Sequence, residues 1–317
     1  MALGYVALVL HAHLPFVRHP ERDYILEEEW LYEAITETYI PLLRVFEGLK
    51  RDGIDFKMTM SLTPPLVSML QDPLLQERYN DHLTKLQELV IKEIENNQHN
   101  GHIRYLAEFY HQEFAQIRET WEQYNGNLLI GFKQFLESNN LEIMTSGATH
   151  GYLPLMKMYP QAVWAQIKVA CDHYHEAFGR PPKGIWLPEC AYYEGLEKML
   201  AKAGLRYFII DGHGILYANP RPRHGTYAPV FTETGVAAFG RDHESSSQVW
   251  SSKMGYPGDP EYREFYKDLG WEADYDYIEP YIMPNGQRKN TGIKYHKITN
   301  TQGNICLLYT SPSPRDQ

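Results

Sequence analysis

The 317-residue sequence predicts an α/β protein built from parallel βαβ units. Short apolar runs that close on polar residues recur along the chain, and each has the length of a buried strand. Stretches with apolar residues at three- and four-residue spacing lie between several of these runs and predict amphipathic helices. One long stretch, from about residue 72 to 140, has helical composition without a convincing strand. We therefore expect parallel strands joined by helices, with a helical insertion between two strands.

Five apolar runs are the predicted strands: Gly4–Leu10, Phe56–Met60, Leu141–Met144, Gly184–Leu187 and Tyr207–Ile210. Ligands of such folds bind at the carboxyl ends of the strands. The titratable side chains that follow these runs are His11, His13, His150, Glu189, Asp211 and His213. We expect them to lie along one edge of the sheet, where so many polar groups are hard to explain by packing.

Helical spacing covers Tyr32–Lys50, Gln161–Phe178 and Tyr193–Ala203. Pro160 marks the start of the second helix and Gly204 the end of the third. After Gly212 the chain becomes rich in Gly, Pro and Ser, which predicts long loops over the mouth of a barrel.

The formal net charge is −10 and no run of Lys or Arg exceeds two residues, so nucleic acid and anionic membranes are excluded as partners. A neutral, hydroxyl-rich ligand is compatible with this charge. The sequence has no signal-peptide pattern and no apolar run of membrane-spanning length. Its three cysteines show no disulfide or zinc spacing. We expect a cytoplasmic protein.

Two patterns bear on chemistry, and each has alternatives. Glu189 could be an ion-pair partner, a helix N-cap, or a nucleophile or general base held at a strand end. His11 and His13, separated by one residue, could bind zinc as in metal-dependent hydrolases, or could hydrogen-bond sugar hydroxyls. There is no GxSxG, Walker or HExxH motif.

The segments HAHLPF (11–16), ATHGYLPLM (148–156) and GIWLPECAY (184–192) resemble the first three conserved regions of glycoside hydrolase family 57. Residues 239–271 and 290–299 look like its 1,4-α-glucan branching-enzyme subgroup. The resemblance implies an incomplete (β/α)7 TIM-like barrel with an inserted helical region, followed by a C-terminal helical domain.

By this resemblance Glu189 is the catalytic nucleophile of a retaining mechanism that needs no metal or cofactor. The positions that the resemblance and the strand-end pattern assign to glucan binding are His11, His13, His150, Trp186, Asp211, His213, Arg241, Trp250 and Gly258. Tyr217 is similar to a mobile-loop position that favours transfer over hydrolysis. Trp250 and Trp271 are either stacking platforms for sugar rings or core residues.

The resemblance also implies an acid/base aspartate beyond residue 305. The last residues, CLLYTSPSPRDQ (306–317), resemble a translated sequencing adapter and not native chain. We therefore expect residues 1–305 to be a catalytic barrel truncated before the C-terminal helical domain, and this chain to be nearly inactive.

The function that the family resemblance implies is that of a 1,4-α-glucan branching enzyme, which transfers a glucan segment to a 6-hydroxyl. A family 57 α-amylase or 4-α-glucanotransferase is the first alternative. A metal-dependent amidohydrolase or deacetylase that uses the two histidines is the second, and a non-catalytic glucan-binding fragment is the third.

Overall fold

The structure is a computed structural model that describes residues 4–251, 253, 255, 259 and 267–297. Its contacts divide the chain into two compact units. The first comprises Met1–Phe16, Gly53–Leu70 and Phe132–Ser246, and the second Val17–Asp52, Gln71–Gly131 and Ser247–Gln317. Gly258 and the tail 306–317 lie outside the described residues, and the predicted domain boundaries stay predictions.

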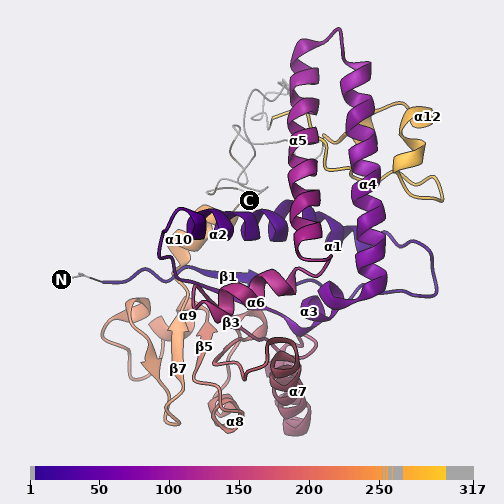
Figure 1. Cartoon of the computed structure of the whole chain (residues 1–317). Coiled ribbons are helices and arrows are strands. Elements are labelled where there is room, and N and C mark those ends of the chain that lie inside the picture. Colours follow the sequence, from indigo (N-terminus) through magenta and orange to yellow (C-terminus); the bar gives the residue numbers. More distant parts are fainter. Residues whose placement is uncertain (1–3, 252, 254, 256–258, 260–266, 298–317) are drawn as a thin grey trace. The chain divides into compact units, whose positions relative to one another are not determined.

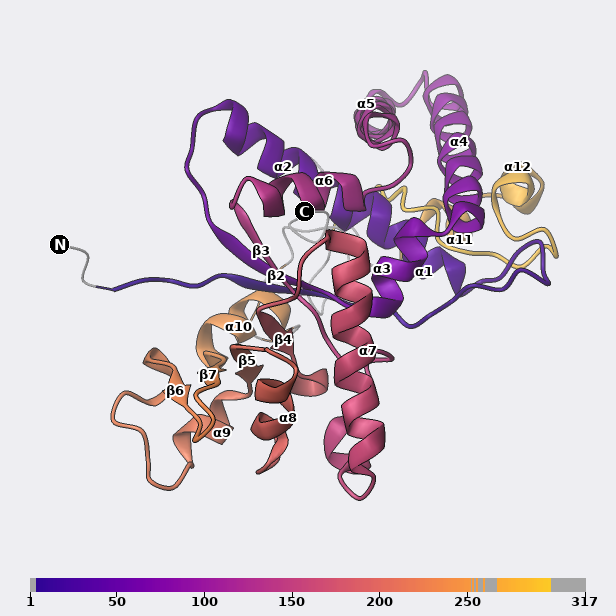
Figure 2. The same cartoon turned by 60° about the horizontal axis from the view of Figure 1, so that its bottom comes forward.

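The first unit is built on parallel strands (Figures 1 and 2). One sheet has the order β1-β2-β3 and the other the order β4-β5-β7-β6, in which only β6 is antiparallel to its neighbour. The strands are β1 (Val9–Ala12), β2 (Met58–Leu62), β3 (Leu141–Met144), β4 (Gly184–Trp186), β5 (Tyr207–Ile210), β6 (Val230–Phe231) and β7 (Ala237–Gly240). A parallel bridge between Thr145 and Ile185 joins the two sheets.

The predicted α/β class is confirmed, but the described residues form an open sheet and not a closed barrel. The pairings run from β1 to β6, and none of them joins these two edges. Closing a barrel requires a complete ring of tilted strands. β7 was missed by the sequence analysis, which expected only loops after Gly212. In the structure this stretch also forms α9 (Gly212–Leu216), η4 (Gly225–Tyr227) and α10 (His243–Trp250).

Helices pack their apolar faces against the strands of the first unit. α7 (Pro160–Phe178) has Pro160 in its first turn and ends at Gly179, which adopts a left-handed φ of 74°. Val163 and Ile167, four residues apart, join the core beneath β4 and β5. The remaining elements of this part of the chain are α3 (Pro64–Gln71), α6 (Leu129–Glu137), η2 (Leu153–Met156), η3 (Pro188–Cys190) and α8 (Leu196–Lys202).

The second unit is helical. Its elements are α1 (Glu28–Ala34), the π-helix η1 (Ile35–Tyr39), α2 (Ile40–Arg51), α4 (Pro73–Asn96), α5 (Gly101–Gln123), α11 (Leu269–Glu272), α12 (Tyr275–Ile278) and η6 (Glu279–Tyr281). α4 and α5 form an antiparallel hairpin (Figure 1). Asp72 caps α4 by accepting the Leu74 and Leu75 N–H groups at 3.0 and 3.1 Å.

Two buried carboxylates fasten residues 268–295 within this unit. Asp268 accepts the backbone N–H groups of Gly270 and Thr291, each at 2.8 Å. Glu93 on α4 accepts the hydroxyls of Tyr277 and Tyr295 at 2.6 and 2.9 Å. These bonds tie the late segment to a helix that precedes it by about two hundred residues.

None of the helices in the described part of the chain is both long enough and apolar enough to cross a membrane.

Candidate active site

Three histidines and a tryptophan stack at the carboxyl ends of the strands in the first unit. The ring centroids of His11 and Trp186 are 4.3 Å apart with an interplanar angle of 11°. The rings of His13 and His150 are 3.8 Å apart, and those of His11 and His150 are 5.3 Å apart. The structure therefore brings together four of the residues that the sequence analysis assigned to glucan binding. We call these four side chains the histidine cluster.

A hydroxyl group holds each of the three imidazoles. The Nδ1 atoms of His11, His13 and His150 lie 2.6, 3.1 and 3.0 Å from Ser61 Oγ, Thr63 Oγ1 and Ser146 Oγ. The sequence analysis missed these hydroxyls as site residues. They could have been found from the register of two parallel strands, which pairs His11 with Ser61. In this register the S-x-T pattern of residues 61–63 lies beside the H-x-H pattern of residues 11–13.

Ser146 fixes the tautomer of His150. Its hydroxyl has one proton, which it donates to the backbone oxygen of Trp186 at 2.8 Å. Because a carbonyl can only accept, Ser146 Oγ must in turn accept a proton from His150 Nδ1. The Nε2 atom of neutral His150 is then unprotonated and available to accept a hydrogen bond from a hydroxyl.

The imidazoles are neutral at physiological pH. Burial, together with His150, His13 and Arg241 nearby, lowers the pKa of His11 to about 3. Burial and His13 lower the pKa of His150 to about 4. Burial also lowers the pKa of His13, although the Glu189 carboxylate opposes this shift. A neutral imidazole has one donor and one acceptor nitrogen, which matches the hydrogen bonding of sugar hydroxyls.

Glu189 is an exposed carboxylate on a strained turn. It lies in the short 3-10 helix η3 directly after β4, and its side chain is within electrostatic range of His13. Its φ is 54°, and those of Cys190 and His150 are 52° and 54°. A left-handed conformation costs a residue with a side chain roughly 1–2 kcal/mol. Such strain concentrates where it serves a site, and here three strained residues share one sheet edge.

The interpretation of Glu189 as a helix N-cap is wrong. The next helix, α8, is preceded by Gly195, and its N-terminal N–H groups are not bonded to Glu189. Glu197, in the first turn of α8, accepts the N–H of the N-cap residue Gly195 at 2.8 Å and the Tyr192 hydroxyl at 2.6 Å.

Arg241, after β7, faces the histidine cluster. Its guanidinium carbon lies 5.7 Å from the centre of the Trp186 ring. One of its nitrogens is 4.0 Å from the sulfur of Cys190, which is buried. The Asp211 backbone N–H donates to the Cys190 carbonyl at 3.3 Å, so Asp211 is at the same edge. His213 pairs with Asp211 at 3.3 Å, and its side chain is 75% exposed.

Other predicted site residues are not joined to the cluster by the described contacts. Tyr217 follows α9 with 82% of its surface exposed. Trp250 and Trp271 are both exposed and belong to the second unit, so neither is a core residue. Gly258 is outside the described residues.

The geometry does not favour the two-histidine metal alternative. Within the described residues, no group of three or more His, Cys, Asp or Glu side chains is arranged to hold a metal ion. Zinc ligands surround the ion tetrahedrally, whereas the rings of His11 and His13 are stacked, with centroids 6.1 Å apart and an interplanar angle of 21°.

The family model described as Glycosyl hydrolase family 57 matches residues 7–309. The chain belongs to this family. The fold agrees with solved structures of two α-glucan enzymes. It is similar to the α-amylase AmyC from Thermotoga maritima, with a TM-score of 0.92 and 48% identity, covering 96% of this chain and 59% of that one. It is also similar to the GH57-type branching enzyme from Pyrococcus horikoshii, with a TM-score of 0.81 and 32% identity, covering 96% of this chain and 55% of that one.

Among curated proteins, the 1,4-alpha-glucan branching enzyme TK1436 of Thermococcus kodakarensis is 34% identical over 83% of this family 57 chain and 42% of its own length. This chain thus spans about half of the length of the relatives it matches.

Proposed function

We propose that this family 57 chain is the part of an α-1,4-glucan-acting enzyme that carries the nucleophile Glu189. The observation that carries the proposal is the exposed carboxylate, held in a left-handed turn next to neutral imidazoles and an indole. Trp186 and Arg241 border the same edge. A stacked aromatic with nearby hydrogen-bonding rings suits a neutral sugar better than an ion.

In the proposed mechanism, one oxygen of the Glu189 carboxylate attacks the anomeric carbon while the bond to the leaving oxygen breaks. The product is a glycosyl ester on Glu189. A second carboxylate, about 5–5.5 Å away, protonates the leaving oxygen and later deprotonates the acceptor. This second carboxylate stays a prediction of the family resemblance. His150 Nε2 would accept a hydrogen bond from a sugar hydroxyl in the bound state.

Similarity favours the α-amylase type over the branching type that the sequence analysis preferred. The α-amylase AmyC is 48% identical, whereas the two branching enzymes are 32% and 34% identical. In the α-amylase case the acceptor is water. Branching is the second candidate, supported by the name of the Thermococcus relative, and its acceptor is a glucan 6-hydroxyl.

The nucleophile is tested with 5-fluoro-α-D-glucosyl fluoride, whose fluoride leaves without protonation and therefore needs no acid catalyst. We expect mass spectrometry to find a covalent adduct on the peptide that contains Glu189. Glu189→Gln should abolish the adduct. The control variant Glu194→Gln, which removes a neighbouring exposed carboxylate, should form the adduct as the unaltered chain does. An adduct that persists in Glu189→Gln, or the lack of any adduct in the unaltered chain, would contradict the assignment.

The reaction type is tested with maltotriosyl fluoride as donor and maltoheptaose as acceptor. Release of free maltotriose supports the α-amylase type. New α-1,6 anomeric protons in the NMR spectrum of the products support branching, and new α-1,4 links alone support a glucanotransferase.

A further inference from the structure

Gln166 on α7 lies next to the loop that carries His150. Its side chain is half-buried and makes two hydrogen bonds to one residue, Thr149. Gln166 Oε1 accepts the Thr149 backbone N–H at 2.9 Å, and Gln166 Nε2 donates to Thr149 Oγ1 at 2.7 Å. A backbone N–H can only donate, so the Thr149 N–H determines which end of the Gln166 amide faces it. The proposed chemistry assigns no role to either residue.

The backbone of Gln166 holds the same loop. Its carbonyl oxygen accepts the Ala148 N–H at 2.9 Å. Residues 147–150 form a turn, which the His150 N–H closes by donating to the Gly147 carbonyl at 2.9 Å. Gln166 therefore bonds both central residues of this turn, Ala148 and Thr149, through three hydrogen bonds. We call these three bonds the Gln166 clamp.

The Gln166 amide also packs against the glycines on both sides of His150. A Cβ added to Gly147 would lie 3.2 Å from Gln166 Oε1 and 3.4 Å from Pro188 Cγ. A Cβ added to Gly151 would lie 3.6 Å from Gln166 Cδ. Gly147 thus lies between the Gln166 amide and the turn η3, which carries the proposed nucleophile.

The clamp connects a rigid helix to a strained residue. Val163 and Ile167 fix α7 in the core, because both are fully buried. A polar group on such a helix is held more precisely than one on a loop. His150 needs this support because its φ is 54°, a left-handed conformation that is unfavourable for a residue with a side chain. Without the clamp the turn can relax toward negative φ, and the His150 ring then leaves its stack on His13.

We propose that Gln166 is a positioning residue for His150. The Gln166 clamp holds the turn in the conformation that stacks the His150 ring 3.8 Å from the His13 ring and within hydrogen-bond distance of Ser146. Gln166 acts only through the turn and touches no reacting atom. The consequence for sugar binding rests on the proposed function, whereas the position of the ring does not.

The test compares Gln166→Leu with Gln166→Glu. Leu fills a similar volume but removes both side-chain hydrogen bonds to Thr149. Glu can still accept the Thr149 N–H, and its second oxygen can accept from the Thr149 hydroxyl, which is able to rotate. In Gln166→Leu the Hε1 proton of His150 should lose the shielding of the stacked His13 ring, so its NMR signal should move downfield. In Gln166→Glu the signal should keep its position. The signal is identified by its loss in His150→Asn.

Sugar binding is the second readout. Maltoheptaose is titrated into the ¹⁵N-labelled chain, and the indole N–H resonance of Trp186 reports binding at the histidine cluster. Loss of the hydrogen bond between a sugar hydroxyl and His150 predicts about two- to twelvefold weaker binding in Gln166→Leu. Thr149→Val removes only the hydroxyl and keeps the N–H bond, so it should weaken binding less. Gln166→Glu should bind as the unaltered chain does.

Gln161→Leu is the matched control. Gln161 is exposed on the same helix, and no side-chain hydrogen bond within the described part of the chain involves it. This variant should change neither the His150 signal nor the Trp186 titration.

An unchanged His150 signal in Gln166→Leu overturns the proposal. So does a signal that Gln166→Glu or Gln161→Leu moves as far as Gln166→Leu does, because the clamp is then not the cause. If Gln166→Leu does not fold, Thr149→Val decides: the His150 signal should move part of the way, and an unmoved signal overturns the proposal.

Failure of the two proposals can be told apart. A His150 signal that moves as expected, in a chain whose Trp186 resonance never responds to maltoheptaose, supports the clamp and contradicts glucan binding. An unmoved His150 signal with intact covalent labelling of Glu189 contradicts only the clamp.

Discussion

Replacing Ser146 by Ala should remove two hydrogen bonds and release the tautomer of His150. Ser146 is fully buried, donates to the Trp186 carbonyl and accepts from His150 Nδ1. A buried hydrogen bond contributes about 0.5–1.5 kcal/mol net, so Ser146→Ala should lower the free energy of unfolding by roughly 1–3 kcal/mol. The matched variant is Ser61→Ala, which is also fully buried but bonds only His11 among the described side-chain contacts. Ser61→Ala should lower the free energy of unfolding by about half as much as Ser146→Ala.

The decisive readout is the ¹⁵N spectrum of the His150 ring, because a merely structural serine would not affect it. In the unaltered chain we expect a protonated Nδ1 and an unprotonated Nε2. In Ser146→Ala the ring should shift toward the Nε2–H tautomer, and maltoheptaose should bind more weakly at the cluster reported by Trp186. Urea unfolding measures the predicted loss of unfolding free energy in both variants. An Nε2–H tautomer in the unaltered chain would refute the proton assignment, even if Ser146→Ala proved unstable.

Three further predictions follow from the same unit. In the folded chain the pKa of His11 is lowered from 6.5 to about 3 and that of His150 to about 4. Below pH 6.5 the unfolded chain therefore binds protons that the folded chain does not. The urea concentration at the midpoint of unfolding should fall as the pH drops from 6.5 to 4. His150→Asn should make that fall shallower, and an unchanged slope would contradict the lowered pKa. Gly184→Ala would place a Cβ 2.2 Å from the Tyr207 ring, so it should lower the free energy of unfolding by about 1–3 kcal/mol or more. A melting temperature equal to that of the unaltered chain would disprove the close packing. Glu189→Gly should remove the left-handed backbone strain and raise the free energy of unfolding by up to about 1 kcal/mol. The same variant should not form the covalent glycosyl adduct. A free energy of unfolding lower than that of Glu189→Gln would argue against strain at this residue.

Local pattern predicted the bounds of two buried strands. Leu141–Met144 and Tyr207–Ile210 have the predicted bounds, because these short runs are buried and flanked by polar residues. The first strand begins at Val9 and not at Gly4, since residues 4–8 are exposed and no strand pairing among the described residues includes them. β7, with its sequence AAFG, lacks the β-branched residues that signal a strand and depends on pairing with β5.

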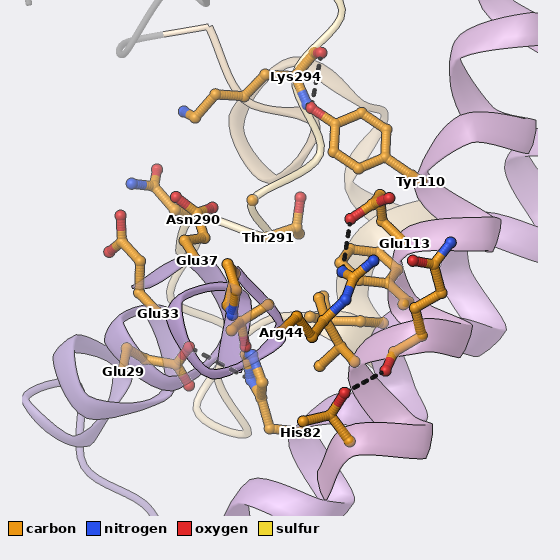
Figure 3. A pocket seen from close by; sticks show the side chains of 18 of the residues that line it. Glu29, Glu33, Glu37, Arg44, His82, Tyr110, Glu113, Asn290, Thr291 and Lys294 are labelled. Carbon is orange, nitrogen blue, oxygen red and sulfur yellow. Dashed lines mark hydrogen bonds and ion pairs between the residues drawn. The ribbon is translucent and has the colours of Figure 1, made fainter. Parts of the chain in front are cut away.

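The candidate site was predictable where strand ends carry titratable residues. His11, His13, His150 and Glu189 fall in that class, and the parallel arrangement brings them together as expected. The supporting hydroxyls were not predictable, because pairing Ser61 with His11 requires the strand register. The second unit contains a hollow lined by α1, η1, α2, α4, α5 and part of residues 271–294 (Figure 3), and this hollow was not predictable either. It depends on tertiary packing among segments up to about 260 residues apart, of which Lys289 against Glu29 is one example.

The buried carboxylate of Glu93 has a consequence for the order of folding during synthesis. Its hydroxyl partners, Tyr277 and Tyr295, leave the ribosome long after the α4–α5 hairpin has emerged. Until then the hairpin carries a carboxylate whose native shielding is missing, and α4 must keep it hydrated. The nascent helical unit should therefore stay open and protease-sensitive until Tyr277 and Tyr295 have emerged and bonded to Glu93.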